Sequence, residues 1–261
     1  MSMAGHERPA YLLYHNLWRV LDWVFPPTCG GCDTLGSRWC ESCQQQVKRV
    51  SGPVCPICGE PASGVCLKCS SHPPEYTALR SFGFFQGPLR EAIHRLKYNS
   101  DIGLAEPLSN HLIELYNELK WAVDVVAPVP LGLKRIKTRG YNQSGLLGRP
   151  LAYAINKSYQ PGVLMRTRET RSQVGLSAAE RRQNMDGAFS ARANRVSGKT
   201  ILIVDDVTTT GSTMNACAQA LRQAGASAVY GLTLARALSP SADSQADADD
   251  QPKPLSQRIW R

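Results

Sequence analysis

The sequence has no apolar run long enough to cross a bilayer, which takes roughly 20 residues. The nearest approach is YLLYHNLWRVLDWVF near the start, which His15, Arg19 and Asp22 interrupt and no small-residue cleavage site follows. We therefore expect neither a membrane span nor a secretion signal, and we predict a cytoplasmic protein. The apolar residues recur at helical spacing, so residues 1–24 are predicted to form an amphipathic helix packed on the next module. Attachment to a membrane surface is the alternative.

The sequence also has no excess of acidic residues. The 261 residues carry a formal net charge of +9, and 43% of them are hydrophobic. A core of that size excludes wholesale disorder. The basic excess favours nucleic acid, phosphorylated metabolites or a membrane surface as partners, without choosing among them. Residues 239–261 are the exception, because they are polar and acidic, and we predict that this tail is disordered.

Cysteine is present in an ordered pattern. Eight of the nine cysteines form four C-x2-C pairs, and the spacing C-x2-C-x7-C-x2-C occurs twice, offset by 26 residues. In a reducing compartment such pairs bind metal more often than they form disulfides. Two C-x2-C turns complete the tetrahedral S4 site of structural zinc, with disulfides or iron–sulfur clusters as alternatives. We predict two structural zinc ions in residues 25–72, bound by Cys29, Cys32, Cys40, Cys43, Cys55, Cys58, Cys66 and Cys69.

The four C-x2-C turns can be paired around the two zinc ions in two ways. The seven-residue links favour local pairing, because a short loop costs less entropy to close. A cross-braced arrangement would instead join the first C-x2-C to the third. Few basic or aromatic residues accompany the cysteines, namely Arg38, Lys48, Arg49, Lys68 and Trp39. These residues are too few to indicate a nucleic-acid-binding surface, so a structural or protein-contact role is favoured over DNA contact.

Residues 76–238 alternate strand-like and helical segments. PLREAIHRLKY and NQSGLLGRPLAYAIN have helical periodicity, whereas VDVVAPVP, TILIVDDV and AVYGLTLAR are short and apolar. Continuous apolar strands that alternate with helices predict an α/β fold, with a parallel sheet covered on both faces.

A Walker loop is missing, because no G-x4-G-K-[ST] occurs. Residues 201–213, ILIVDDVTTTGST, offer a different phosphate cradle at the start of a helix. Its hydroxyls and its glycine are supplied by Thr209, Thr210, Gly211, Ser212 and Thr213. Asp205 and Asp206 would repel a phosphate unless they face ribose hydroxyls or Mg2+.

This string resembles the PRPP-binding motif of type I phosphoribosyltransferases. Over residues 29–236 the chain resembles the ComF family of competence protein F-like proteins, which includes the enterobacterial GntX. FQGPLREAIHRLKY, PVPLGLKRIKTRGYNQS and RTRETRSQVGLSAAERRQNMDGAF fit the same family. The resemblance implies a double zinc ribbon followed by a phosphoribosyltransferase-like parallel sheet flanked by helices. It implies that Asp205 and Asp206 hold the ribose of PRPP with Mg2+, and that residues 209–213 hold its 5-phosphate.

Two basic segments accompany the motif. Lys134, Arg135, Lys137 and Arg139 follow one strand, and Arg166, Arg168, Arg171, Arg181 and Arg182 crowd a second segment. Loops after parallel strands collect at one sheet edge, where a pyrophosphate leaving group needs positive charge. We therefore predict Lys134 and Arg135 as PRPP ligands, and Arg139 and Arg166 as catalytic residues with the two aspartates. A nucleic-acid face or a plain basic surface are the alternatives. The resemblance makes the first segment the pyrophosphate loop and RTRETRSQVGLS the flexible loop that closes over the site.

A carboxylate is missing at Thr209, where purine-salvage phosphoribosyltransferases carry an aspartate that assists proton removal from a base. This disfavours nucleobase salvage. The predicted function is that of an enzyme that binds PRPP with Mg2+ and transfers phosphoribose to an unidentified acceptor, associated with competence, DNA uptake or DNA utilisation. The alternative is a non-catalytic PRPP sensor or a factor that handles single-stranded DNA with DNA-uptake proteins. The sequence does not indicate an oligomeric state.

Overall fold

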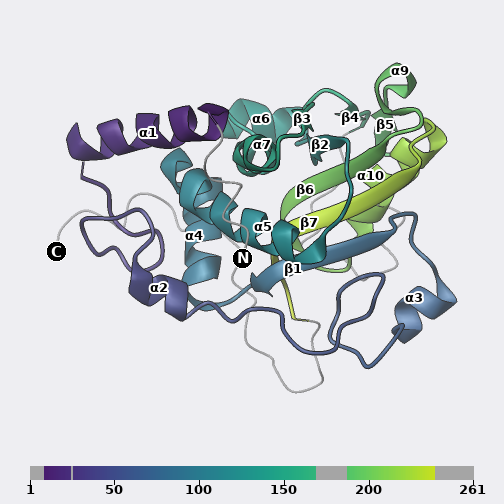
Figure 1. Ribbon diagram of the computed structural model, residues 1–261, viewed down its shortest axis with the longest axis horizontal. Coiled ribbons are helices and arrows are strands. Elements are labelled where there is room, and N and C mark those ends of the chain that lie inside the picture. The colour runs from purple at the N-terminus through teal and green to yellow at the C-terminus, as the bar shows by residue number, and fades with distance from the viewer. Residues whose placement is uncertain (1–8, 25, 169–186, 239–261) are drawn as a thin grey trace.

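The computed structural model of the chain describes residues 9–24, 26–168 and 187–238 (Figure 1). Its central five-stranded sheet has the order β1-β7-β6-β2-β3. Every neighbouring pair of these strands is parallel. The strands are β1 (Ala78–Phe84), β2 (Val125–Pro128), β3 (Ser158–Tyr159), β6 (Thr200–Thr208) and β7 (Ala228–Arg236). The predicted parallel α/β sheet is therefore confirmed.

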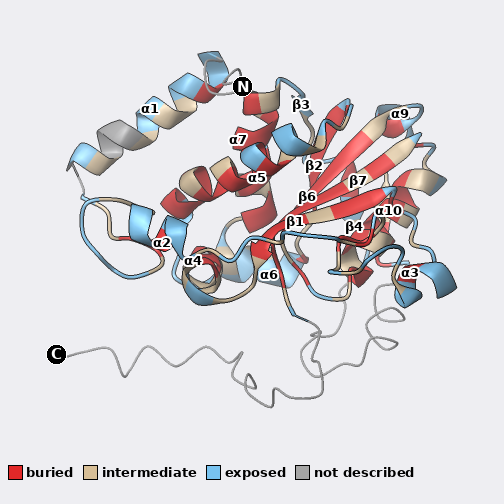
Figure 2. Cartoon of the chain, turned by 60° about the horizontal axis from the view of Figure 1, so that its bottom comes forward, coloured by how far each residue is buried: buried red, intermediate tan, exposed pale blue. Residues whose placement is uncertain are grey.

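Both faces of the sheet are covered, because its strands are apolar on both sides. Leu202 and Val204 of β6 belong to one buried cluster, and Ile201 and Ile203 belong to the other. The first cluster includes α4 (Gly87–Tyr98), α5 (Ala105–Leu119) and α7 (Gln143–Ile155), and the second includes α10 (Ser212–Gln223), β4 (Leu164–Arg166) and β5 (Phe189–Ala191). Figure 2 shows this buried layer along the strands and the helices around them. Each buried leucine or isoleucine contributes roughly 1.5–3 kcal/mol.

The shortest helices were not predicted, because a helix of three to seven residues is too short to show hydrophobic periodicity. They are α2 (Glu41–Gln45), α3 (Leu67–Ser71), the 3-10 helix η1 (Ile102–Leu104), α6 (Leu133–Arg139) and α9 (Ala193–Val196). Helix α2 contains Cys43, the last cysteine of the first repeat, and α3 contains Cys69, the last cysteine of the second repeat. Figures 1 and 2 both place α2 and α3 on opposite sides of the molecule.

The N-terminal helix α1 (Pro9–Val24) lies across α7 and α5 (Figure 1). Tyr11 donates a hydrogen bond to Asn110 Oδ1 at 2.6 Å, and His15 Nδ1 lies 2.7 Å from Glu106 Oε1. The helix was predicted to pack on the next module along the chain, and Asp22 does pair with Arg38 there. Its anchors on α5, however, come from a segment about 90 residues further on. Among the described helices, none is long and apolar enough to cross a membrane.

The open edge of β1 is covered by the segment that links the two cysteine groups. The amide of Phe84 donates to the carbonyl of Lys48 at 2.8 Å, and the amide of Val50 donates to the carbonyl of Phe82 at 2.9 Å. Arg49 and Gly83 form the antiparallel bridge between these bonds. An exposed strand edge is a template for pairing with other chains, so this segment protects the sheet.

Candidate functional site

The site lies where the connectivity of the sheet changes direction. The adjacent strands β2 and β6 continue to opposite sides, since β2 leads to β3 and β6 leads to β7. In parallel α/β sheets a crevice opens outside the carboxyl ends of such strands, and ligands bind there. Pro128, the last residue of β2, pairs with Val204, so β2 ends beside the residue that precedes Asp205.

The two aspartates at this end of β6 have different partners. The Ser144 hydroxyl, in the first turn of α7, donates to Asp205 Oδ1 at 2.6 Å, and the amide of Asp206 donates to the same oxygen at 3.0 Å. Asp206 is buried, and its Oδ2 lies 2.9 Å from the Nζ of Lys97 on α4. Three elements therefore converge on the carboxylates: β6, the start of α7 and the end of α4.

The electrostatics separate the two carboxylates. Burial, aided by the negative charge of Asp206, raises the pKa of Asp205 to about 7. Burial is the largest influence on the pKa of Lys97 and lowers it, but the charge and hydrogen bond of Asp206, together with the charges of Tyr98 and Asp205, hold that pKa above its usual value. Asp206 thus has a cationic partner, whereas the negative charge of ionised Asp205 is only partly balanced by nearby positive charge. Ribose hydroxyls or a hard cation such as Mg2+ would supply what Asp205 lacks, so the donor set fits both.

The predicted phosphate cradle follows directly after β6. Gly211 precedes α10 and has a φ of +78°, a conformation that favours glycine. The hydroxyls of Thr210 and Ser212 lie 2.7 Å apart, and the Ser212 amide donates to Thr210 Oγ1 at 3.4 Å. Thr209 is exposed. Hydroxyls and amides at the start of a 12-residue helix are suited to an anion.

The first basic segment forms a helix, not the predicted loop. It is α6, which glycines bound at both ends, Gly132 as its N-cap and Gly140 at a φ of +83° as its C-cap. Lys134 and Arg135 are exposed on this helix. Arg139 is half-buried, donates to Gln143 Oε1 at 2.5 Å and places its guanidinium 5.3 Å from the centre of the Tyr98 ring. Arg139 therefore lies beside the first turn of α7, which carries Ser144.

The second basic segment is described only in part. Arg166 ends β4, and its guanidinium lies 5.6 Å from the centre of the Phe189 ring. Burial raises the pKa of the Cys217 thiol in α10, with Asp205 raising it further and Arg166 opposing the rise. Arg166 and Asp205 thus act on the same thiol. Arg171, Arg181, Arg182 and most of the predicted flexible loop lie outside the described residues.

The cysteines form two separate groups of four, as the short links predicted. The sulfurs within each group all lie within 4.8 Å of one another, and we name residues 29–43 ribbon 1 and residues 55–69 ribbon 2. Backbone amides point at the sulfurs: Cys40 N–H donates to Cys29 Sγ at 3.4 Å, and Cys66 N–H donates to Cys55 Sγ at 3.4 Å. Hydrogen bonds from Thr34 lower the pKa of Cys32 to about 6. Four clustered thiols with amide donors fit tetrahedral zinc, so both groups support a bound zinc ion.

The sequence-based interpretation did not identify Lys97, Ser144 and Lys68 as site residues. Lys97 lies in a helix that was predicted, and Ser144 follows the helix cap Asn142, but nothing local in the sequence pairs either with an aspartate. Lys68 of α3 donates to the carbonyl of Thr210, 142 residues away. These partners come from distant elements, so only the tertiary fold reveals them.

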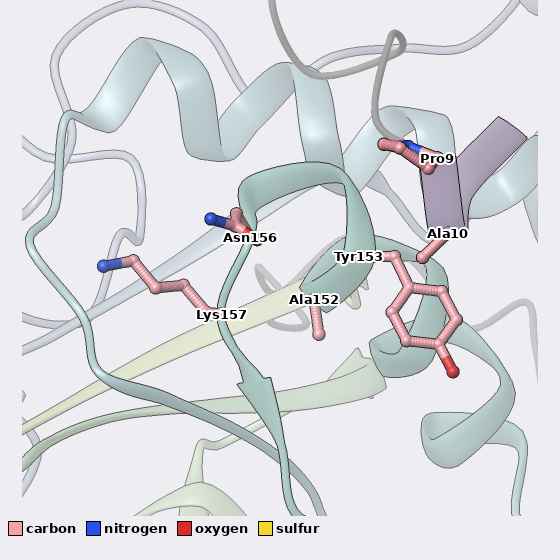
Figure 3. A pocket seen from close by; sticks show the side chains of 6 residues that line it. All are labelled: Pro9, Ala10, Ala152, Tyr153, Asn156 and Lys157. Carbon is pink, nitrogen blue, oxygen red and sulfur yellow. The ribbon is translucent and has the colours of Figure 1, made fainter.

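A surface pocket lies away from these residues, between the start of α1 and the end of α7 (Figure 3). It is lined by Pro9, Ala10, Ala152, Tyr153, Asn156 and Lys157. Ser144 is at the opposite end of α7. The lining has neither a carboxylate nor a cysteine, so this pocket is not part of the candidate site.

Two family models match the chain. Residues 20–72 match the double zinc ribbon domain, and residues 133–258 match the phosphoribosyl transferase domain. Together with the parallel sheet and the two cysteine groups, these matches define a class: a double zinc ribbon joined to a phosphoribosyltransferase domain.

Relatives place the chain more closely. It is 35% identical over 207 residues to DNA utilization protein YhgH of Escherichia coli (strain K12), an alignment that covers 76% of this chain and 90% of that protein. It is 32% identical over 208 residues to competence protein F of Haemophilus influenzae, with 76% and 90% covered. Competence protein ComFC of Bacillus subtilis is 27% identical over 207 residues, with 76% and 83% covered. The chain therefore belongs to the ComF family.

Solved structures match about half of the chain, with TM-scores below 0.5. Glutamine PRPP amidotransferase from B. subtilis is 28% identical, with a TM-score of 0.37, and the match covers 51% of this chain and 27% of that chain. Adenine phosphoribosyltransferase from Thermoanaerobacter pseudethanolicus is 16% identical, with a TM-score of 0.34 and coverage of 54% and 83%.

Proposed function

We propose that this protein binds PRPP with Mg2+ at the carboxyl end of β6 and transfers its phosphoribosyl group to an acceptor, releasing pyrophosphate. One observation carries the proposal. Asp205, with its pKa raised to about 7, lies four residues before a hydroxyl-lined loop at the start of α10. An undercompensated carboxylate beside an anion cradle suits a ligand that carries both hydroxyls and phosphate.

Each part of the ligand has a proposed partner. Residues 209–213 bind the 5-phosphate, and Asp205 and Asp206 accept hydrogen bonds from the ribose hydroxyls. Ser144 and Lys97 orient these carboxylates through the contacts already described. Mg2+, bound with PRPP, would supply positive charge to the pyrophosphate.

The transfer is a displacement at the anomeric carbon. The acceptor's lone pair forms the new bond, the bond to pyrophosphate breaks with its electron pair, and the acceptor's proton passes to water. Lys134, Arg135, Arg139 and Arg166 are the proposed cations that stabilise the departing charge. Thr209 supplies no carboxylate base, which favours an amine acceptor, because an amine needs less help than a nucleobase in losing its proton.

Isothermal titration with PRPP and Mg2+ tests binding. Wild type should bind, and an Asp205→Ala/Asp206→Ala variant should not. Glu91→Ala, which removes an exposed carboxylate of α4, serves as the matched control and should bind like wild type. Absence of binding by wild type, or equal binding by the double variant, contradicts the proposal. Pyrophosphate release from PRPP in the presence of a metabolite mixture then tests transfer.

A second candidate function is the handling of single-stranded DNA in the cytoplasm, with DNA-uptake proteins as partners and PRPP as a signal. The names of the relatives refer to DNA utilization and competence, and the net charge of +9 favours a polyanion. A gel shift with single-stranded DNA should lose affinity steeply with salt, because phosphate contacts release counterions. No shift at low salt would argue against this function.

A further inference from the structure

Ribbon 2 forms part of the wall behind the phosphate cradle. Cys55, Cys58 and Cys69 are buried in the same core cluster as Tyr76 and Met214, a residue of the first turn of α10. A Cβ placed on Gly211 would lie 3.2 Å from the Tyr76 hydroxyl. The backbone of the cradle therefore packs directly against a side chain that shares its core with the zinc ligands.

The ribbon is also fixed to the sheet by backbone contacts. The amide of Leu79 in β1 donates to the carbonyl of Ile57 at 2.7 Å, and buried Arg236 at the end of β7 donates to the carbonyl of Cys58. A Cβ on Gly59 would lie 2.5 Å from the carbonyl oxygen of Leu79, so the two backbones are in close contact. Ribbon 2 therefore has little freedom to move relative to β1 and β7.

From this fixed ribbon, Lys68 reaches the cradle itself. Its ammonium donates to the carbonyl of Thr210. The described part of the chain has no cis peptide bond, so the carbonyl of Thr210 and the amide N–H of Gly211 point in opposite directions. A cation held on that carbonyl therefore fixes the direction of the Gly211 amide. It also places a positive charge beside the loop.

Ribbon 1 has no equivalent of Lys68. The repeat offset of 26 residues places Ser42 at the corresponding position. Ser42 accepts a hydrogen bond from Gln46 Nε2 at 3.1 Å, a contact within its own segment. The chain thus carries two copies of one metal fold, of which ribbon 2 supplies a lysine to the cradle.

We propose that Lys68 is a positioning residue of the phosphate cradle, and that zinc in ribbon 2 holds it there, so that the zinc content of ribbon 2 sets the affinity for phosphorylated ligands. This inference rests on the proposed function, in which residues 209–213 bind the 5-phosphate of PRPP. It adds a residue and a metal dependence to that site.

The first experiment needs no ligand. Hydrogen–deuterium exchange of peptides that cover residues 208–213 is compared in wild type, Lys68→Met, Lys68→Arg and the control Lys48→Met, which removes an exposed lysine between the ribbons. Exchange should be faster in Lys68→Met, near wild type in Lys68→Arg, and unchanged in Lys48→Met. Wild-type exchange in Lys68→Met overturns the positioning role.

The second experiment measures PRPP affinity with Mg2+ in excess. Lys68→Met should bind about tenfold more weakly, as expected for loss of a charge-assisted hydrogen bond, and Lys68→Arg should restore most of the loss. A zinc-selective chelator, used at a concentration at which circular dichroism shows the chain still folded, should weaken wild type by a similar factor but should change Lys68→Met little further. A Ser42→Ala variant, altered at the exposed position of ribbon 1 that corresponds to Lys68, should keep wild-type affinity.

The two experiments separate the possible failures. If wild type binds no PRPP, the proposed function fails, and the exchange data alone still decide whether Lys68 holds the loop. If wild type binds PRPP and Lys68→Met binds equally well, the proposed function stands and this inference is overturned.

Discussion

Ribbon 1 and ribbon 2 share several of their internal contacts. In each, the amide of the third cysteine donates to the sulfur of the first at 3.4 Å, and a five-residue helix, α2 or α3, follows the third cysteine. Asp33 donates its amide to the carbonyl of Cys29 at 2.9 Å, as Gly59 does to the carbonyl of Cys55. The metal-binding design is therefore the same in both copies.

The two ribbons differ in what they dock against. Ribbon 1 is held by Arg95 of α4, which donates to the carbonyl of Cys29 at 3.1 Å, and its Cys32 is exposed. In ribbon 2 the equivalent Cys58 is buried in the core cluster that contains α10. The ligand positions are the same in both ribbons, whereas Lys68 of ribbon 2 and its counterpart Ser42 of ribbon 1 differ. The comparison shows that two copies of one metal site can take different roles through side chains that do not bind the metal.

Removal of one zinc ligand from each ribbon should give the largest difference. Cys69→Ser opens a cluster that also holds strands β2, β6 and β7, whereas Cys43→Ser lies outside both core clusters. We expect Cys69→Ser to cost about 5 kcal/mol or more of unfolding free energy, and Cys43→Ser clearly less. Thermal unfolding with zinc content per chain measures both. Equal losses would show that the ribbons are equivalent.

Helix α4 carries one cationic side chain that contacts the site and another that contacts ribbon 1, and each contact can be removed separately. Lys97→Met leaves Asp206 buried and uncompensated, and should destabilise the protein by about 3–5 kcal/mol. Arg95→Met, two residues earlier, releases ribbon 1 and should cost less, because the Arg95 partners are partly exposed. Denaturant unfolding compares the two, with Lys97→Arg as the control that retains the charge. A larger loss in Arg95→Met would mean that ribbon 1 supports the sheet more than Lys97 does.

Equivalent positions in the two ribbons should respond differently to alanine. Gly59 has a φ of +71°, and its new Cβ would meet the Leu79 carbonyl, so Gly59→Ala should cost about 3 kcal/mol. Asp33 has a φ of 62° and an exposed side chain, so Asp33→Ala should cost about 1 kcal/mol or less. Unfolding midpoints measure this difference. Similar midpoints would indicate that ribbon 2 can shift away from β1.

The smallest expected difference between the ribbons concerns Asp205, because Asp205 is held by α7 rather than by either ribbon and so serves as an internal standard. Its folded pKa of about 7 lies above its ordinary value of 3.8, so the stability that it contributes is present below pH 4 and is lost as pH rises through 7. Asp205→Asn should flatten the unfolding free energy between pH 4 and 7.

Ligand binding should show the opposite trend with pH. PRPP affinity should fall about tenfold per pH unit below 7, because the ionised carboxylate is the form that binds. Titrations across pH 5–8 measure this slope. Wild type and Cys40→Ser should share it, and a slope that changes with ribbon 1 would contradict the independence of Asp205 from that ribbon.

Much of this architecture was predictable from local patterns. The apolar run before Asp205 predicted β6, the periodicity after Gly211 predicted α10, and the short cysteine links predicted local grouping. Each of these signals lies within about 15 residues of chain. The assignment of PRPP-binding and catalytic roles to individual residues stays a prediction, which the titrations above test.

The rest could not be predicted, because its causes are distant in the chain. The contacts of Lys97 with Asp206 and of Lys68 with Thr210 join elements more than 100 residues apart. The basic segment that begins at Lys134 was interpreted as a loop, since four cations in six residues hide the periodicity of a seven-residue helix. The position of β1 beside β7 likewise has no local signal.

The pairing of β1 with β7 has a consequence for how the chain folds. The hydroxyls of Ser81 and Thr233 lie 2.7 Å apart, although 152 residues separate the two positions in the chain. The sheet is therefore completed only after its last strand has been synthesised. Each ribbon draws its zinc ligands from its own short segment, and both segments precede the last strands of the sheet during synthesis. Contacts between such distant segments form slowly. Ribbon 2 with bound zinc would therefore form before β7 and the Thr210 loop emerge from the ribosome. It would offer these later segments a surface on which to pack.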